Sequence, residues 1–403
     1  MTSAAPVVII ALAALAVFFM KHARLKNYAF TVWVFAFVAA SMFYPALFRA
    51  WFGQDLKILI VPLIQIITFG MGTTLNLKNF ERVITMPWPV CIGIILQFSI
   101  MPLVGLGIAT AFGFEPEIAA GVILIGSVPS GVASNVMTYL AGGNVPLSVT
   151  ITSCTTLLSP FMTPLLMRLL AGRFIQVDLV SMMLSILNMI IVPIAAGLIA
   201  NKILYSRNRW ARRAGSLASI SAASIALAVA VFFVPSSAFG PLAPLKSGIM
   251  LGGLLIGLVT VAKLVVNVLL QGPDNWMDHA LPIVSMVSIC LIIAVITAQS
   301  RDQLLTVGLL LIMASILHNG TGYLLGYWGA RLARLDESAC RAVAMEVGMQ
   351  NGGLASGIAV DVLKSMSAAL APAIFGPWQN ISGSILASFW RRRPPSSRSS
   401  PRP

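Results

Sequence analysis

The stretch ACRAVAMEVGMQNGGLASGIAV, residues 339–360, decides the fold. It lies in a part of the chain apolar enough to span a bilayer, yet it contains the carboxylate of Glu346, followed by the polar, glycine-rich run 348–353. A charged side chain near the centre of a membrane costs about 3 kcal/mol on insertion scales. A glycine-rich break at that depth also frees backbone groups that lipid cannot satisfy. Both features are explained if the helix unwinds inside the protein around something charged.

A second interrupted segment lies in the first half of the chain. Residues 121–140 read GVILIGSVPSGVASNVMTYL, and Pro129, Ser130 and Gly131 break the apolar run. Two interrupted spans, one in each half of the chain, are a typical sign of a transporter binding site. The sequence therefore predicts a ligand site between two broken helices.

The bulk composition excludes a soluble domain. Of 403 residues, 58% are hydrophobic and 9% are charged, and the mean hydropathy is +0.92. These values predict an all-α polytopic membrane protein. The net charge of +14 does not indicate nucleic-acid binding, because the basic residues stand in short clusters between apolar runs. The four cysteines lack metal-ligand spacing, and we assign them structural roles: Cys91, Cys154, Cys290 and Cys340.

Apolar runs long enough to span a bilayer follow one another along the chain. The first, residues 4–20, precedes Lys21, Arg24 and Lys26, whereas a signal peptide carries its positive charge before the apolar core. We therefore predict an extra N-terminal span; an interfacial helix and a misassigned start codon are the alternatives. The other predicted spans are 28–48, 56–77, 88–112, 117–142, 147–170, 179–203, 217–235, 247–270, 280–299, 304–330, 338–360 and 368–390.

The basic residues in the connections predict the orientation. If these spans are right, four basic clusters lie on one side of the membrane, which the Lys/Arg bias assigns to the cytoplasm. We thus predict a multi-pass protein of the inner (plasma) membrane with a cytoplasmic C-terminus and a disordered basic tail, residues 391–403. Glu115 lies on the other side, as do Arg168 and Arg173, which run against the bias. The clusters are Lys78 and Arg82; Lys202, Arg207, Arg209, Arg212 and Arg213; Arg331, Arg334 and Arg341; and Arg391, Arg392 and Arg393.

Glu346 is the acidic residue that lies well inside a predicted span. A salt bridge to Lys263 or Arg168 is the structural alternative to a functional role. A carboxylate beside unwound backbone suits sodium, since freed carbonyl groups supply further oxygen ligands. Other oxygens that could join Glu346 are the carbonyls of Val347 and Met349, the amides of Gln350 and Gln97, and the side chains of Ser134, Asn135, Ser148 and Thr152.

Ser148 and Thr152 are spaced i, i+4, so their hydroxyls share one helix face. Each hydroxyl could instead bond the carbonyl four residues earlier in its own helix. The half-helix that starts near Ser134 would direct its positive dipole end toward the membrane midplane, where an anionic substrate group can bind. Bound sodium would then cancel the charge of Glu346 before the anion binds.

At these residues the chain resembles the bile acid:sodium symporter family, especially its bacterial members. The resemblance covers about residues 28–203 and 275–392. It implies ten core helices in two inverted five-helix repeats, with a panel domain and a core domain that contains two crossed broken helices. The motifs that carry it are FGMGTTLNL (69–77), LQFSIMPL (96–103), GVASNVMTYLAGGNVPLSVTITS (131–153), LHNGTGYLLG (317–326), EVGMQNGGLA (346–355) and WQNISGSILASFW (378–390).

The resemblance also implies two sodium sites and a substrate site. The first sodium would bind Ser134, Asn135, Ser148, Thr152 and Glu346, and the second Gln97, Glu346, Val347, Met349 and Gln350. Substrate would contact Val132, Asn135, Asn351, Gln379 and Asn380. The chain departs from close relatives at Ser130-Gly131-Val132, at Asn351-Gly352-Gly353, and at Gln379, where relatives often carry histidine. In the family these positions face the substrate side, so the resemblance predicts the sodium ligands and not the identity of the substrate.

Residues 204–274 have no counterpart in the short bacterial members. We predict a peripheral helix pair that snorkels Lys263 or pairs it locally. The predicted organisation is an N-terminal extra span (1–27), the first repeat and the start of the second (28–203), the insertion (204–274), the rest of the second repeat (275–390) and the tail (391–403). The chain is expected to act as a monomer or homodimer.

The leading hypothesis is a sodium-coupled importer of an organic carboxylate, with the bilayer and sodium as its other partners. A substrate-gated sensor on the same fold is one alternative. Metalloid efflux is another, but it would need a thiolate at a broken helix, and Cys154 lies in an unbroken span. An enzyme is not indicated, because the sequence lacks HExxH and GxSxG motifs, and we read His318 as a hydrogen-bonded structural group.

Overall fold

The computed structural model describes residues 5–22, 25–74, 84–206, 208–273 and 275–393. These residues form an all-α protein, apart from one short strand pair. Eight of the helices in this part of the chain are long and apolar enough to cross a membrane. Lys78, Arg82 and residues 394–403 of the predicted tail lie outside the described residues.

The first half of the chain contains several long helices and the first helix break. Its elements are α1 (Ala5–Lys21), α2 (Lys26–Phe43), α3 (Ala46–Arg49), β1 (Ala50–Trp51), β2 (Gln54–Asp55), η1 (Leu56–Leu59), α4 (Ile60–Thr74), α6 (Pro87–Ala111), α7 (Pro116–Ser127), α8 (Ala133–Leu140), α9 (Val145–Leu166), η2 (Met167–Ala171), α10 (Leu179–Ile186), η3 (Leu187–Ile191) and α11 (Val192–Tyr205). Antiparallel β1 and β2 pair Ala50 with Asp55.

The second half begins with the predicted insertion and ends with the second break and a long last helix. Its elements are η4 (Arg209–Arg212), α12 (Ala214–Phe233), η5 (Ser236–Leu245), α13 (Lys246–Lys263), η6 (Leu264–Leu269), α14 (Trp276–Gln299), α15 (Arg301–Leu332), α16 (Glu337–Gly348), α17 (Gly352–Asp361) and α18 (Met366–Arg391).

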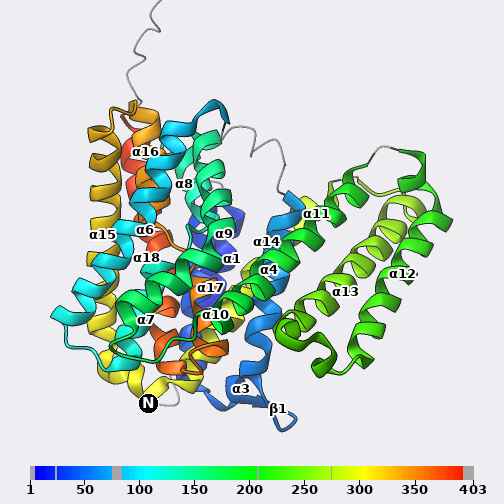
Figure 1. Cartoon of the computed structure of the whole chain (residues 1–403), viewed down its shortest axis with the longest axis horizontal. Coiled ribbons are helices and arrows are strands. Elements are labelled where there is room, and N and C mark those ends of the chain that lie inside the picture. The colour runs from blue at the N-terminus through cyan, green and yellow to red at the C-terminus, as the bar shows by residue number, and fades with distance from the viewer. Residues whose placement is uncertain (1–4, 23–24, 75–83, 207, 274, 394–403) are drawn as a thin grey trace, which may run out of the picture.

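The helices form a main body with a helix pair at its side (Figure 1). In the body, α6 packs on α7 and α15, α18 packs on α7 and α17, and α16 packs on α15. Helices α4, α11 and α14 lie next to this group, with α11 against α4 and α14 against α2 and α4. The pair α12–α13 stands apart and meets the rest mainly through α13 on α11. The insertion therefore lies at the periphery of the molecule.

The two broken helices are the most deeply buried elements. Every residue of the segments 118–127 in α7 and 339–348 in α16 is buried. The apolar side chains of α7 belong to one large core cluster that also includes parts of α10, α17 and α18. Because neighbouring helices surround both segments, the breaks that follow them are shielded from lipid, as an unwound backbone requires.

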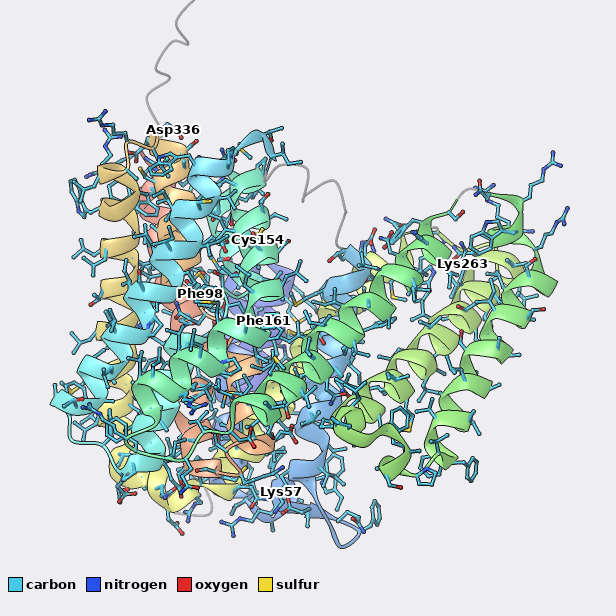
Figure 2. All side chains as sticks on the ribbon, in the orientation of Figure 1. Lys57, Phe98, Cys154, Phe161, Lys263 and Asp336 are labelled. Atoms are coloured by element: carbon cyan, nitrogen blue, oxygen red, sulfur yellow. The ribbon has the colours of Figure 1, made fainter. Side chains whose placement is uncertain are left out.

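Contacts between connections show which ends of the helices lie together. The Asn144 N–H bonds the carbonyl of Ser338 at 2.9 Å, and the Trp88 indole bonds the carbonyl of Ala333 at 3.1 Å. Figure 2 places Asp336 at this end and Lys57 at the opposite end. The described basic residues between 331 and 341, and those at 391–393, therefore gather at one end, as the sequence predicts. Glu117 lies at the other end, where it accepts a 2.5 Å hydrogen bond from Ser365.

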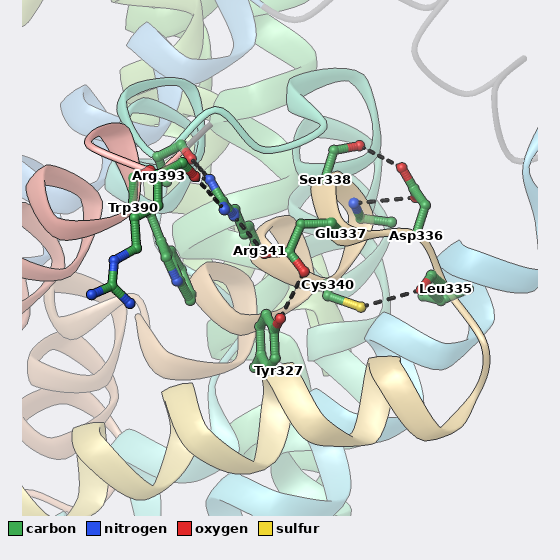
Figure 3. Close-up of polar contacts among 11 residues, drawn as sticks. Tyr327, Leu335, Asp336, Glu337, Ser338, Cys340, Arg341, Trp390 and Arg393 are labelled. Atoms are coloured by element: carbon green, nitrogen blue, oxygen red, sulfur yellow. Dashed lines mark hydrogen bonds and ion pairs between the residues drawn. The ribbon is translucent and has the colours of Figure 1, made fainter. Parts of the chain in front are cut away.

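Arg341 joins three helices at the basic end (Figure 3). Its side chain is 4% exposed and forms a 2.9 Å ion pair with Glu337, one turn earlier in α16. The guanidinium donates to the carbonyls of Ala141 at 2.9 Å, Trp390 at 3.2 Å and Arg393 at 2.7 Å. A planar guanidinium with five N–H groups suits several acceptors at once. Arg341 thereby fixes the ends of α8 and α18 to the start of α16.

Candidate functional site

The first break follows from Pro129. A proline disfavours helical conformation in the residue before it, and Val128 is extended, with φ −84° and ψ 161°. Helix α7 therefore ends at Ser127, and α8 starts again at Ala133. The predicted break is confirmed in position, and the N-terminal end of α8 lies inside the protein body.

The second break lies just before the glycine pair. Met349 is extended, with φ −122° and ψ 104°, and ends α16. The side chain of Asn351 accepts a 3.0 Å hydrogen bond from the N–H of Leu354 and so caps α17. Gly352 and Gly353 form the first turn of α17, and a Cβ on Gly352 would lie 3.3 Å from the carbonyl oxygen of Pro372 in α18. Gly352 therefore allows α17 to start close against α18.

The two breaks pair directly with each other. Ser130 and Gln350 form an isolated antiparallel bridge. The Gly131 N–H bonds the carbonyl of Met349 at 2.8 Å, and the Asn351 N–H bonds the carbonyl of Pro129 at 2.9 Å. A Cβ at Gly131 would lie 2.9 Å from the carbonyl oxygen of Gln350, so glycine is needed for this approach. Each break thus supplies hydrogen-bond partners for backbone groups that the other break leaves without helical partners, as buried polar groups require.

Glu346 lies beside this crossing and is 0% exposed. Its Oε1 accepts hydrogen bonds from Ser134 at 2.6 Å and Ser148 at 2.5 Å, and its Oε2 accepts one from Thr152 at 2.7 Å. The Ser148 hydroxyl oxygen also lies 2.8 Å from the amide oxygen of Asn135. The five residues of the first predicted sodium group are therefore in one place. The Thr152 hydroxyl also lies 3.1 Å from the carbonyl of Ser148 in its own helix, and its single proton is shared between this carbonyl and the nearer carboxylate oxygen of Glu346.

A basic partner for Glu346 is not found in the described part of the chain. The described ion pairs do not include Glu346. The ammonium of Lys263 bonds the carbonyls of Ile203 and Leu204, near the end of α11, at 2.6 and 2.9 Å. Figure 2 shows Lys263 in the peripheral helix pair, away from the main body. Arg168 is exposed. The salt-bridge alternative does not hold in this structure.

The residues of the second predicted sodium group lie along the two breaks. Gln97, 0% exposed, donates from Nε2 to the carbonyl of Val128 at 3.1 Å, and its buried Oε1 has no hydrogen-bond partner among the residues that the structure describes. Gln350 donates from Nε2 to the carbonyl of Val347 at 2.5 Å, whereas the carbonyl of Met349 accepts the Gly131 N–H. A buried amide oxygen without a partner is costly. Gln97 Oε1 is therefore an oxygen available to a cation.

The predicted substrate residues differ in their surroundings. Val132 is exposed, and Asn135, Asn351 and Asn380 are partly buried. The side chain of Asn380 bonds the carbonyl of Gly376 in its own helix at 3.0 Å. Gln379 is 2% exposed, and its Nε2 donates to Oε1 of Gln350 at 2.7 Å. Gln379, which is itself buried, therefore contacts Gln350, a predicted sodium ligand.

Two residues at the second break were not singled out from the sequence. Asn319 in α15 donates to the carbonyl of Gly348 and accepts from the hydroxyl of Ser382 in α18. Both residues lie in motifs of the family resemblance, and a buried amide within the apolar run of α15 is the signal that could have identified Asn319. The neighbouring His318 is buried and bonds the carbonyl of Met101 at 3.1 Å, in agreement with a structural role.

The donor set around Glu346 fits sodium. A carboxylate, hydroxyls, amide oxygens and backbone carbonyls are hard oxygen ligands, and the donors that bond the buried charge in the described part of the chain are the neutral hydroxyls of Ser134, Ser148 and Thr152. Among the described residues, no three His, Cys, Asp or Glu side chains gather in a group that could hold a transition metal. A monovalent cation would compensate the charge of Glu346 without needing a second carboxylate.

The fold and the site define a class of protein: a multi-pass α-helical carrier with two paired helix breaks beside a buried carboxylate. A solved sodium–proton antiporter from Methanocaldococcus jannaschii has the same overall fold. It superimposes with a TM-score of 0.55 over 98% of this chain and 99% of that chain, at 12% sequence identity.

Sequence comparisons give the family. The family model described as Sodium Bile acid symporter family matches residues 61–238. YocS, an uncharacterised sodium-dependent transporter of Bacillus subtilis, is 36% identical over 373 residues, covering 93% of this chain and 94% of the relative. The human ileal sodium/bile acid cotransporter is 30% identical over 309 residues, covering 75% and 69%. The chain belongs to the sodium bile acid symporter family.

Plant relatives extend the range of cargo named in this family. The probable sodium/metabolite cotransporter BASS1 of Arabidopsis thaliana chloroplasts is 27% identical over 367 residues, covering 91% of this chain and 74% of the relative. The relatives named here are sodium-dependent transporters and not enzymes. Membership of the family implies sodium as the coupling ion.

Proposed function

We propose that this protein imports an organic carboxylate together with sodium, using two sodium ions at the paired breaks and an alternating-access cycle. The observation that carries the proposal is the Glu346 carboxylate, buried between two unwound segments and bonded by three hydroxyl groups. Family membership supports sodium as the coupling ion. The first ion would bind the group around Ser134, Asn135, Ser148 and Thr152; the second would bind Gln97, Val347, Met349 and Gln350; Glu346 would serve both.

The net charge of the site explains why sodium and an anion would bind together. Glu346 contributes one negative charge, so an anion arriving alone would be repelled in a medium of low dielectric constant. Two sodium ions convert this to one net positive charge, which one carboxylate neutralises. The N-terminal ends of α8 and α17 lie at the same crossing, and helix N-termini favour anions. Each ligand thereby raises the affinity for the other, as coupling requires.

The orientation and location form part of the proposal. The basic residues at 331–341 and 391–393 gather at the end of the bundle opposite to Glu117. From the positive-inside bias we assign that end, with the C-terminus, to the cytoplasmic side of a plasma membrane. The inverted five-helix repeats and the division into panel and core are proposed on the family resemblance.

Uptake into proteoliposomes tests this function. The protein is reconstituted, and labelled pantoate, 2-oxobutanoate and taurocholate are offered with sodium or potassium outside. We expect at least one carboxylate to accumulate against its gradient when sodium is outside, and accumulation to stop when potassium replaces sodium. Equal uptake with either cation would contradict sodium coupling. Sodium-dependent binding of a carboxylate without any uptake would favour a sensor.

The orphaned oxygen of Gln97 gives a residue-level prediction. Gln97→Leu removes an oxygen ligand of the second proposed sodium ion, so the half-saturating sodium concentration of uptake is expected to rise about tenfold. A sodium titration of initial uptake rate measures this. Gln65→Leu is the matched control, because Gln65 is also a buried amide that bonds a backbone carbonyl, that of Asn188, but in α4. An unchanged titration in Gln97→Leu would argue against the second ion.

A further inference from the structure

A chain of hydrogen bonds connects α18 to the second break through two glutamine side chains. Gln379 donates from Nε2 to Oε1 of Gln350 at 2.7 Å, and Gln350 donates from Nε2 to the carbonyl of Val347 at 2.5 Å. Gln379 is 2% exposed and Gln350 4% exposed. Two of the oxygens proposed to bind the second sodium ion, the Val347 carbonyl and Gln350 Oε1, therefore belong to this chain.

The Val347 carbonyl, which can only accept, and the NH₂ group of Gln379 together determine which end of the Gln350 carboxamide is oxygen. A carboxamide carries an acceptor oxygen on one side and an NH₂ group on the other. If the Gln350 group turned over, its NH₂ would face the NH₂ of Gln379, and the Val347 carbonyl would face an oxygen. Both contacts would be repulsive, and burial leaves little water to relieve them. Gln379 and Val347 therefore hold the oxygen of Gln350 in one orientation.

The amide oxygen of Gln350 keeps bonding capacity in that orientation. An amide oxygen has two lone pairs, and Gln379 uses one of them. The second lone pair can coordinate a cation, whereas the NH₂ group of Gln350 cannot. The same bond also fixes α18 to the break, with a second link from Ser382 through Asn319 to the carbonyl of Gly348.

We propose that Gln379 is a positioning residue for the second sodium ion: it holds the Gln350 carboxamide with its oxygen ready for the cation, and through this bond links α18 to sodium binding. The inference rests on the proposed function, because it takes Gln350 as a sodium ligand. It assigns to Gln379 a role in the cation site, which differs from the contact with substrate expected from the sequence.

Sodium alone is the probe in the test. The full-length protein in detergent is titrated with sodium chloride at constant ionic strength, with choline chloride as the balance, and the midpoint of thermal unfolding is followed. Gln379→Leu removes the donor, and we expect its half-saturating sodium concentration to rise about fivefold, the loss of one hydrogen bond. Gln379→His keeps a ring N–H of similar reach and should stay within about twofold of the wild type. Gln65→Leu is again the control.

A double-mutant cycle shows whether Gln379 acts through Gln350. In a Gln350→Leu background, Gln379→Leu should cause no further change in the sodium titration. A further fivefold change there, or an unchanged titration in the single Gln379→Leu variant, would overturn the inference. If Gln379→Leu does not fold, Gln379→Asn replaces it, because its shorter side chain cannot reach Gln350 and should give the same fivefold loss.

The two proposals fail in different ways. A wild-type protein whose unfolding midpoint does not respond to sodium contradicts the proposed function. A normal sodium response in the wild type, with the same half-saturating concentration in Gln379→Leu and Gln379→Asn, contradicts only the role of Gln379.

Discussion

Glu346→Gln is expected to abolish sodium-driven uptake, with a fall in initial rate of about a hundredfold or more. Glutamine has nearly the shape of glutamate and can still accept hydrogen bonds from Ser134 and Ser148, so the crossing should persist. The neutral amide cannot compensate a cation, and a contact to a charged group of about 3 kcal/mol corresponds to two orders of magnitude in affinity. The initial rate of carboxylate uptake into proteoliposomes with sodium outside measures the effect.

Asp361→Asn is the matched control for this prediction. Asp361 ends the same broken span, is partly exposed and pairs with Lys364 at 3.6 Å. Its neutralisation should leave uptake unchanged, because an exposed ion pair contributes little. Sodium-driven uptake at the normal rate in Glu346→Gln would show that the carboxylate is not needed for coupling.

Arg341→Met is expected to cause the largest loss of stability, about 3 kcal/mol, because the buried guanidinium is the centre of an ion pair and hydrogen-bond network, and removal of one member of such a network is costly. Methionine fills part of the volume but removes the cationic partner of Glu337, whose carboxylate then keeps the hydrogen bond from the Tyr327 hydroxyl. It also removes the guanidinium donor from the carbonyl of Ala141 at the end of α8 and from that of Trp390 at the end of α18, which still accepts the N–H of Arg393. The midpoint of thermal unfolding in detergent, followed by tryptophan fluorescence, measures the loss.

Two further variants separate the geometry of Arg341 from its charge. Arg341→Lys keeps the charge but cannot match the forked donors of the guanidinium, so an intermediate loss is expected. Arg392→Met removes a basic residue that is exposed at the same end, and should change the unfolding midpoint little. Equal midpoints for Arg341→Met and Arg392→Met would mean that the three-helix contact does not stabilise the protein.

The features that the sequence predicted are those set by local chemistry. Pro129 disfavours a helix before it, and the glycine pair at 352–353 weakens one, so both breaks could be placed within a few residues. A carboxylate inside an apolar run needs compensation, which identified Glu346. The periodic spacing of Ser148 and Thr152 placed both hydroxyls on one face, and the structure brings that face to Glu346.

The features that the sequence did not predict depend on contacts between distant segments. The bridge between Ser130 and Gln350 joins residues far apart in the chain, and no local pattern signals it. The Gln350 side chain turns back to bond the carbonyl of Val347 and accepts a hydrogen bond from Gln379 in α18, which is 29 residues away in the chain. Asn319 donates to the carbonyl of Gly348, which has lost its helical partner because α16 ends there. This contact can be recognised only when the break and α15 are seen side by side.

The central claim is that Glu346 and the two breaks form a sodium site, and equilibrium binding of radioactive ²²Na⁺ to the purified protein tests it most directly. The account predicts saturable binding that approaches two ions per chain, is not displaced by excess potassium, and is lost in Glu346→Gln. Binding that fails to saturate, or that is the same in wild-type protein and Glu346→Gln, would contradict it.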